Sequence, residues 1–187
     1  THCISSAASD VYKRQIEGYP SDFFVKKVIE VKPDQVTLVP DPPGALTSSF
    51  GWDCHENKEF LRDTVSEFKK NKIRVSIFIN PLIKTLENLE VIQTDRVELY
   101  TYDYAHNFTE NKDTAIKSYI DVSTYLKKEF PEIKLNAGHD LNLENLKFFL
   151  ENINDIEEVS IGHALICDTF EFGLEKTIKK YLSLTKN

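Results

Sequence analysis

Residues 134–141 have the sequence KLNAGHDL, which is typical of a short apolar strand that ends in glycine and histidine. The strand breaks at Gly138, His139 follows, and an Asn/Asp-rich segment then opens a helix. A histidine at the mouth of such a turn is accessible to a substrate, because loops at strand ends carry binding and catalytic residues. A lone histidine at this point more often only caps or fills the turn. A second Gly-His pair, Gly162-His163, follows the next strand and favours the functional interpretation.

Strand and helix patterns alternate on both sides of this stretch. Strand patterns occupy residues 35–39, 74–79, 96–101, 134–138 and 158–161. Helix patterns occupy residues 23–32, 56–71, 82–92, 111–129, 142–151 and 173–184, and Ser21 or Asp22 is the expected N-cap of the first. Since no hairpin signal lies between the strands, this order predicts a parallel sheet with right-handed crossovers.

Two α/β architectures fit this order, an open doubly wound sheet and part of a (β/α)₈ barrel. No glycine-rich phosphate fingerprint is present. Polar residues instead follow several different strands, and these residues are Thr47, Ser48, Glu98, Thr101, His139 and His163. A site spread over many strand ends favours the barrel, and five strand-centred units are too few to close one. We therefore expect the C-terminal portion of a (β/α)₈ TIM barrel, with its helices outside the parallel strands.

Composition limits the class of protein. The chain of 187 residues is long enough for one domain, and its net charge of −7 argues against a nucleic-acid partner. No apolar run is long enough to predict a membrane span. The three cysteines are scattered without a CxxC motif, which predicts a reducing cytoplasm rather than a disulfide framework.

Residues 1–15, THCISSAASDVYKRQ, have neither a strand nor a helix period. They resemble a translated adapter sequence, and the alternative is a flexible natural tail. The chain begins with Thr1, which indicates an N-terminus that is processed or missing. We expect residues 1–15 to be a non-native or disordered segment and residues 16–187 to form the partial barrel domain.

Several segments together carry a resemblance to a known family. They are VTLVPD, LTSSFGWD, VSIFINP, VELYTYDYA, LNAGHDLNLEN and VSIGHALICDTFEFGLEK, in that order. From about Ile16 to near the C-terminus the chain resembles the pyridoxine 5′-phosphate synthase family, and the paired NAGH and IGHA motifs are the most specific part. Residues 16–18 then correspond to the end of the family's third strand, and strands one and two are absent.

The resemblance implies an enzyme of vitamin B6 synthesis. The family is a cytosolic (β/α)₈ barrel and a homo-octamer that condenses 1-deoxy-D-xylulose 5-phosphate with 3-amino-2-oxopropyl phosphate, with loss of phosphate and water. It needs no metal or organic cofactor, and this sequence likewise has no HExxH motif and no paired His/Cys ligand spacing. The expected partners are thus small phosphorylated substrates and further copies of the chain, with no nucleic acid or membrane.

The resemblance also assigns roles to individual residues. Glu17 matches the family's catalytic base and His139 its proton donor, the two proton carriers that ring closure requires. Thr47 matches a hydroxyl that binds deoxyxylulose phosphate. Gly162 and His163 match the pair that binds the aminooxopropyl phosphate, where glycine lets backbone amides approach the anion.

Two further positions extend this set. Glu98 lies in the sixth family strand and is a possible supporting carboxylate, or else an ordinary core carboxylate paired with a neighbour. Asp140 occupies the substrate-binding position after His139, where the family commonly has glycine, and it adds a negative charge near a phosphate. The family's Glu-Lys-Arg, Gly-Gly and His-Thr-Gly are replaced by residues 41–43, 50–51 and 100–102 respectively.

Two other functions stay open at this point. One is a non-catalytic phosphate-binding or scaffold relative of the barrel, which the altered loops favour. The other is a free-standing flavodoxin-like binding domain, which requires a complete chain. Without strands one and two, we expect the chain to be poorly stable and inactive alone, because sheet edges and barrel interior are uncovered.

Overall fold

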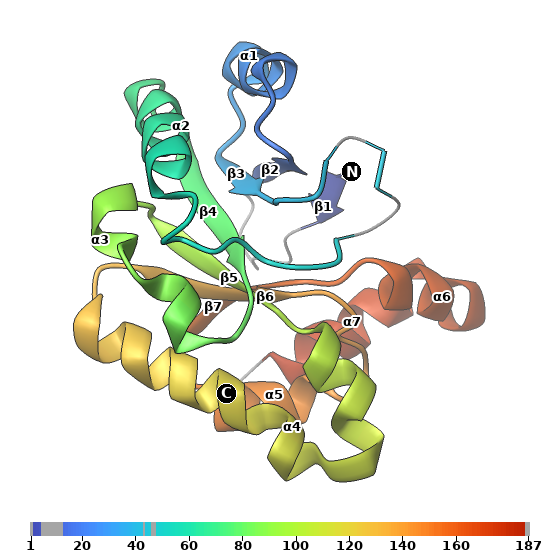
Figure 1. The fold of residues 1–187 in the computed structure, drawn as a ribbon. Helices are drawn as coiled ribbons and strands as arrows, with labels where there is room; N and C mark the ends of the chain where they lie inside the picture. The colour runs from blue at the N-terminus through green and yellow to red at the C-terminus, as the bar shows by residue number, and fades with distance from the viewer. Residues whose placement is uncertain (1, 5–12, 43, 46–47, 186–187) are drawn as a thin grey trace.

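The computed structural model describes residues 2–4, 13–42, 44–45 and 48–185, and a single curved β-sheet lies at its centre (Figure 1). The strands lie side by side in chain order: β1 (His2–Ile4), β2 (Arg14–Gly18), β3 (Gln35–Leu38), β4 (Arg74–Ile79), β5 (Arg96–Tyr100), β6 (Lys134–Gly138) and β7 (Ile156–Ser160). β1 pairs antiparallel with β2, and every later pair is parallel. The predicted parallel α/β sheet is confirmed as a six-strand half-barrel, β2 to β7, and β1 is an antiparallel addition that the sequence pattern did not predict.

The predicted domain boundary at residue 16 falls inside β2. The backbone N–H of Arg14 donates to Asp34 Oδ2 at 2.8 Å, and buried Gln15 Nε2 donates to Thr37 Oγ1 at 3.0 Å. Residues 2–4 pair with β2 as well. These parts of the segment 1–15 are therefore strand residues, and Thr1 and residues 5–12 lie outside the described residues.

Helices cover the outer side of the sheet (Figure 1). They are α1 (Asp22–Val31), α2 (Lys58–Lys70), the 3₁₀ turn η1 (Ile83–Leu86), α3 (Leu89–Ile92), α4 (Tyr102–Glu129), α5 (Leu146–Asn152), α6 (His163–Phe172) and α7 (Leu174–Leu184). Ser21 caps α1 as predicted, since its hydroxyl accepts a hydrogen bond from the Phe24 N–H at 3.3 Å.

Three helix predictions need correction. Residues 82–92 form η1 and the single turn α3, because left-handed Asn88 (φ 67°) separates them. The helix predicted over residues 111–129 begins earlier, because α4 starts at Tyr102. Non-helical Asn111 divides α4 at the predicted start, and its side chain accepts a hydrogen bond from the Thr114 N–H. α6 was not predicted, and it buries no residue fully, which explains its weak apolar period.

The two faces of the sheet differ in chemistry. The outward side chains of the strands are apolar and pack with the helices in one core, with Ile77 and Leu99 of the strands and Leu61 and Phe68 of α2 among its buried members. The inward side chains are mainly polar and bond to one another: Gln15, Gln35, Thr37, Arg74, Arg96, Glu98, Asn136 and Glu158. The fold therefore encloses a largely polar interior, and a small buried apolar cluster of Val39, Phe78 and Tyr100 lies at the carboxyl ends of β3 to β5.

Glu158 of β7 connects the two ends of the half-barrel. Its carboxylate pairs with Lys13, which precedes β2, and with Arg74 Nη2 at 3.2 Å and Arg96 Nη1 at 3.6 Å. Since Lys13 and Glu158 belong to opposite ends of the parallel strand order, the sheet is strongly rolled. β7 hydrogen-bonds to β6 alone among the described strands, so no described strand pairs with its other edge.

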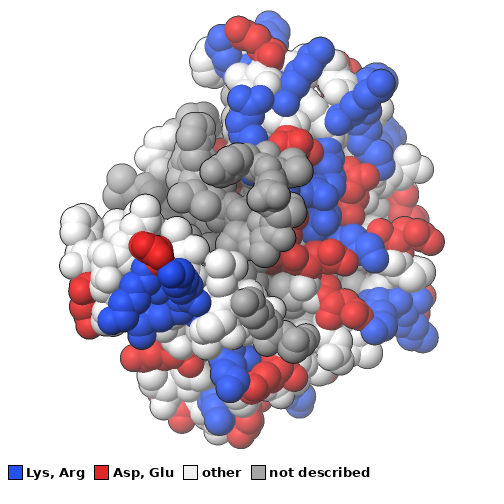
Figure 2. Space-filling view, turned by 180° about the vertical axis from the view of Figure 1, so that it is seen from behind, with Lys and Arg blue, Asp and Glu red and all other residues white. Residues whose placement is uncertain are grey.

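The outer surface carries charges of both signs. Figure 2 shows lysine and arginine interspersed with aspartate and glutamate over the rear face. No helix in the described ranges combines the length and apolar character that crossing a membrane requires.

Candidate active site at the carboxyl ends of the strands

Glu98 lies in the polar interior near the carboxyl end of β5. The residue is 1% exposed, and its carboxylate accepts hydrogen bonds from the hydroxyls of Thr37, at 3.3 Å, and Ser160. Gly138 of β6 provides the space for this carboxylate, because a Cβ at Gly138 would lie 2.4 Å from Glu98 Oε1. The glycine before His139 therefore has a direct packing role.

Glu17 of β2 interacts electrostatically with Glu98. Burial raises the pKa of Glu98 to about 8, and the charge of Glu17 acts in the same direction. Glu17 is half-buried, and burial together with the nearby Asp41 carboxylate raises its pKa as well. The two carboxyls thus hold a proton more tightly than isolated carboxylates do.

His139 follows β6 in an unusual backbone conformation. His139 has φ 93° and Asp140 has φ 57°, so two successive non-glycine residues occupy the left-handed region. The Thr101 hydroxyl donates to the carbonyls of Gly138, at 2.8 Å, and of His139, while Asn145 Nδ2 donates to the Asp140 carbonyl at 3.2 Å. Strained backbone held in place by side chains in this way is frequent at functional sites.

The His139 ring is enclosed by three side chains. Tyr100 meets it edge-on with centroids 4.8 Å apart and planes at 86°, and Tyr102 lies at 5.9 Å and 74°. Asp140 Oδ2 lies 3.2 Å from His139 Nδ1. The imidazole side chain is 15% exposed, which leaves it reachable from one side.

A cavity of about 630 Å³ opens beside this ring. Its lining residues are Ser48, Ser49, Phe50, Asn80, Pro81, Leu82, Tyr100, Tyr102, Asp103, Ser118 and His139. The Tyr100 hydroxyl donates to the Ser48 carbonyl at 3.1 Å, and burial, then the charges of Asp140 and Asp103, raises the pKa of Tyr100 to about 12. Tyr100 therefore stays neutral near pH 7, and the described wall offers hydroxyls, aromatic faces, the Asn80 amide, the Asp103 carboxylate and the His139 imidazole.

The loop between β3 and α2 supplies part of this wall. Asp41 is buried, and its Oδ1 accepts hydrogen bonds from the N–H and the hydroxyl of Ser49, at 2.9 and 2.8 Å. Gly51 lies directly against the end of β4, since a Cβ there would be 2.2 Å from the Asn80 nitrogen. The predicted Thr47 lies outside the described residues.

The structure brings only some of the predicted residues together. Glu17 and Glu98 share the polar interior, and Gly138 connects Glu98 to His139 and Asp140. Gly162 and His163 are exposed at the start of α6, with Gly162 as its N-cap, and they do not line the cavity beside His139. Both residues follow the carboxyl end of β7, and Gly162 is two residues beyond Ser160, the last residue of that strand.

The residue-type patterns did not identify Tyr100, Tyr102, Asp103 and Asp41 as site residues. All but Asp103 stand where the sequence departs from the resembled family, and that departure was the available signal. Phe50, Tyr100 and Tyr102 line the cavity beside His139, and Tyr100 and Asp140 contact the His139 ring. The departures therefore form one connected group around His139.

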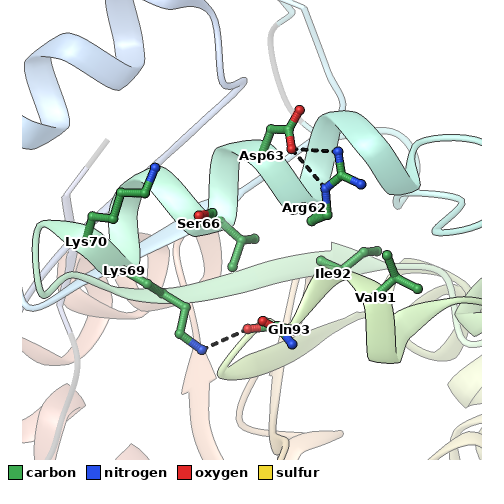
Figure 3. A pocket seen from close by; sticks show the side chains of 9 residues that line it. Arg62, Asp63, Ser66, Lys69, Lys70, Val91, Ile92 and Gln93 are labelled. Carbon is green, nitrogen blue, oxygen red and sulfur yellow. Dashed lines mark hydrogen bonds and ion pairs between the residues drawn. The ribbon is translucent and has the colours of Figure 1, made fainter.

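A second cavity, of about 430 Å³, lies on the outer side between α2 and α3 (Figure 3). Its cations already have partners: Arg62 pairs with Asp63 at 2.8 Å, and Lys69 Nζ donates to the Gln93 carbonyl at 2.9 Å. None of the predicted site residues lines it. Its chemistry is that of a charged surface groove rather than a catalytic site.

Comparison with known proteins identifies the family. The family model described as "Pyridoxal phosphate biosynthesis protein PdxJ" matches residues 4–187. The chain belongs to this family. The PdxJ match includes residues ahead of Ile16, in agreement with the early start of β2.

Curated PdxJ relatives have a common name, "Pyridoxine 5'-phosphate synthase". The protein of that name from Cytophaga hutchinsonii is 49% identical over 167 residues, covering 89% of this chain and 69% of the relative. Those from Christiangramia forsetii and Parabacteroides distasonis are 45% and 48% identical, with 71% and 69% of each relative covered. The chain thus spans about 70% of the length of these relatives.

The solved structures support the fold. A mutant tryptophan synthase alpha-subunit from Pyrococcus furiosus superposes with a TM-score of 0.56 at 20% identity, covering 91% of this chain and 65% of that one. At this identity the likeness concerns the fold, an α/β half-barrel with a TIM-barrel-like neighbour.

Proposed function

We propose that this PdxJ chain contributes the last six strands of a (β/α)₈ barrel and most of the active site of a pyridoxine 5′-phosphate synthase. Three features support the barrel: the sheet is rolled, its interior is polar, and one edge of β7 pairs with no described strand, so further strands could pair there and close it. β2 to β7 then correspond to barrel strands three to eight.

The reaction is the condensation of 1-deoxy-D-xylulose 5-phosphate with 3-amino-2-oxopropyl phosphate. Imine formation, dehydration and ring closure each move protons between carbon, nitrogen and oxygen, so the site needs a base and an acid within reach of one substrate. Glu17 and His139 fill these roles in the proposal, with Glu17 as general base and His139 as proton donor.

The single observation that carries the proposal is the position of Glu98, which interacts electrostatically with Glu17 and packs against Gly138, the residue before His139. Glu98 has a pKa of about 8 and therefore keeps its proton near pH 7, where it remains neutral beside Glu17. Glu17 is the less buried of the two and is left to ionise, which gives a carboxylate base with a raised pKa. Glu98 thereby acts as a support for the base.

Anchoring of the phosphate groups is the second requirement. Gly162 and His163 begin α6, a ten-residue helix, and a helix start provides free N–H groups and a positive dipole end. A Cβ at Gly162 would meet nothing within 4 Å, so this glycine leaves the backbone open to an anion. We assign the aminooxopropyl phosphate to this position and the deoxyxylulose phosphate to Thr47, with Asp140 beside the substrates.

The proposal also extends to assembly and location. Following the family, we propose a cytoplasmic homo-octamer whose partners are its own copies and its phosphorylated substrates. The measured mass in solution tests the assembly directly.

The test uses the complete open reading frame that encodes these 187 residues. The expressed protein is incubated with both phosphates, and ³¹P NMR follows release of inorganic phosphate together with appearance of the pyridoxine phosphate. We expect product from the wild type and a loss of about 10²-fold or more in Glu17→Gln. Absence of product from a folded, full-length wild type would instead support a non-catalytic phosphate-binding relative, which the acidic Asp140 and Asp103 around the cavity favour.

A further inference from the structure

We infer that Asp140 is a positioning residue for His139: its carboxylate holds the Nδ1–H of the imidazole, so that the ring exchanges protons with the substrate through Nε2. The catalytic consequence rests on the proposed function, whereas the contact itself does not. This role differs from direct substrate binding, because Asp140 would act through the histidine.

The contact geometry supports this role. Asp140 Oδ2 lies 3.2 Å from His139 Nδ1, and Nδ1 is shielded from solvent. The tautomer of a neutral histidine is set by the hydrogen-bond partners of its ring nitrogens, and an ionised carboxylate can only accept hydrogen bonds. A carboxylate at Nδ1 therefore favours the Nδ1–H tautomer of the neutral ring, which is the form that remains after a protonated His139 donates its proton from Nε2.

The backbone fixes the carboxylate in this place. Asp140 has φ 57°, a conformation that aspartate tolerates better than most residues, and Asn145 Nδ2 holds its carbonyl at 3.2 Å. The His139 carbonyl is held in turn by Thr101. Neither end of the Asp140–His139 pair depends on a long, freely rotating side chain.

Aromatic and acidic side chains surround the ring. Tyr100 and Tyr102 approach it edge-on at 4.8 and 5.9 Å between centroids. Asp103 lines the same cavity from the first turn of α4, and Glu98 lies beneath Gly138. Asp140 Oδ2, at 3.2 Å from Nδ1, lies at ion-pair distance from the ring.

The decisive test is ¹⁵N NMR of the full chain labelled in its five histidines, with His139 assigned by loss of its signals in His139→Gln. At about pH 9, where imidazole is neutral, we expect His139 to carry its proton on Nδ1. Asp140→Gly, which suits the left-handed backbone, should move the proton to Nε2. Asp140→Asn keeps a neutral acceptor and should retain the Nδ1–H form.

Asp103→Asn is the matched control, because it removes a nearby carboxylate of the cavity and should leave the tautomer unchanged. A wild-type proton on Nε2, or an unchanged tautomer in Asp140→Gly, would overturn the inference.

Activity of the complete enzyme provides the second readout. Asp140→Gly should lower kcat by about tenfold with KM within about twofold, since orientation of the acid is lost and ground-state binding is kept. An unchanged kcat in Asp140→Gly would remove the catalytic role. If His139 carries its proton on Nδ1 as expected but the protein forms no product, the proposed function is refuted and the Asp140–His139 contact stands.

Discussion

Gly138→Ala tests the packing on which the site is built. The added methyl carbon would lie 2.4 Å from Glu98 Oε1 and 3.0 Å from Ser160 Cβ. Both neighbours are constrained, because Glu98 is fully buried and its carboxylate is hydrogen-bonded to Thr37 and Ser160. The carboxylate must therefore move away from at least one partner.

The magnitude follows from two contributions. Overpacking of a filled interior typically costs about 1–3 kcal/mol, and loss of a hydrogen bond to a buried polar group costs about 1–3 kcal/mol. We expect Gly138→Ala to lower the free energy of unfolding by about 2–6 kcal/mol. For a chain of this size that corresponds to a decrease of roughly 4–24 °C in Tm.

Urea unfolding followed by circular dichroism measures this change. Gly162→Ala is the matched control for stability, because a Cβ there meets nothing within 4 Å, and it should stay within about 0.5 kcal/mol of the wild type. In a double-mutant cycle, Glu98→Ala should relieve the clash and recover about 1 kcal/mol or more. The packing argument is refuted if Gly138→Ala is as stable as Gly162→Ala, or if Glu98→Ala gives no recovery.

Three further changes have defined outcomes. Because the pKa of Glu98 is raised from 4.5 to about 8, the folded state binds more protons than the unfolded chain between these pH values, so stability should fall as pH rises from 4.5 to 8. Glu98→Gln should flatten this part of the pH profile of stability, measured by urea unfolding. A profile like that of the wild type would contradict the raised pKa of Glu98. Glu158→Gln leaves Lys13, Arg74 and Arg96 without their common carboxylate and should lower the free energy of unfolding by about 2 kcal/mol or more. The control Glu151→Gln, which removes an exposed ion pair with Lys147, should lower it by less than about 0.5 kcal/mol. Equal effects in chemical unfolding would argue against the interior network. Glu17→Gln should lose activity in the complete enzyme without loss of stability, and a large decrease in Tm would indicate a structural role instead.

The strand order and the parallel pairing could be predicted because both depend on local period. β4 and β5 are short apolar runs bounded by polar turns, and the structure reproduces their predicted starts at Arg74 and Arg96. The extra strand β1 could not be predicted, because a strand of three residues has too few positions to show alternation. α6 was missed for the related reason that a helix without a buried stripe has no clear helical period.

The candidate site was predictable in its residue types and only partly in its geometry. His139 could be selected from its place after a strand and a glycine, and the structure places it on a cavity wall. Its enclosure by Tyr100 and Asp140 depends on two consecutive positive φ angles, which the sequence does not encode in an obvious way, since neither residue is glycine. The interpretation of Glu98 changed most. The sequence left it as either a supporting carboxylate or a core carboxylate, and the structure makes it the buried neighbour of Glu17, because only the strand register shows that Gly138 makes room for it.

The rate of product formation in His139→Ala tests the central claim most directly. The complete enzyme is supplied with both phosphates, and His55→Ala serves as the control, since His55 is an exposed histidine that contacts Asn88 and does not line the cavity. We predict a loss of about 10²-fold or more in His139→Ala and a rate within about twofold of the wild type in His55→Ala. Equal rates in the two variants would contradict a proton-donating His139.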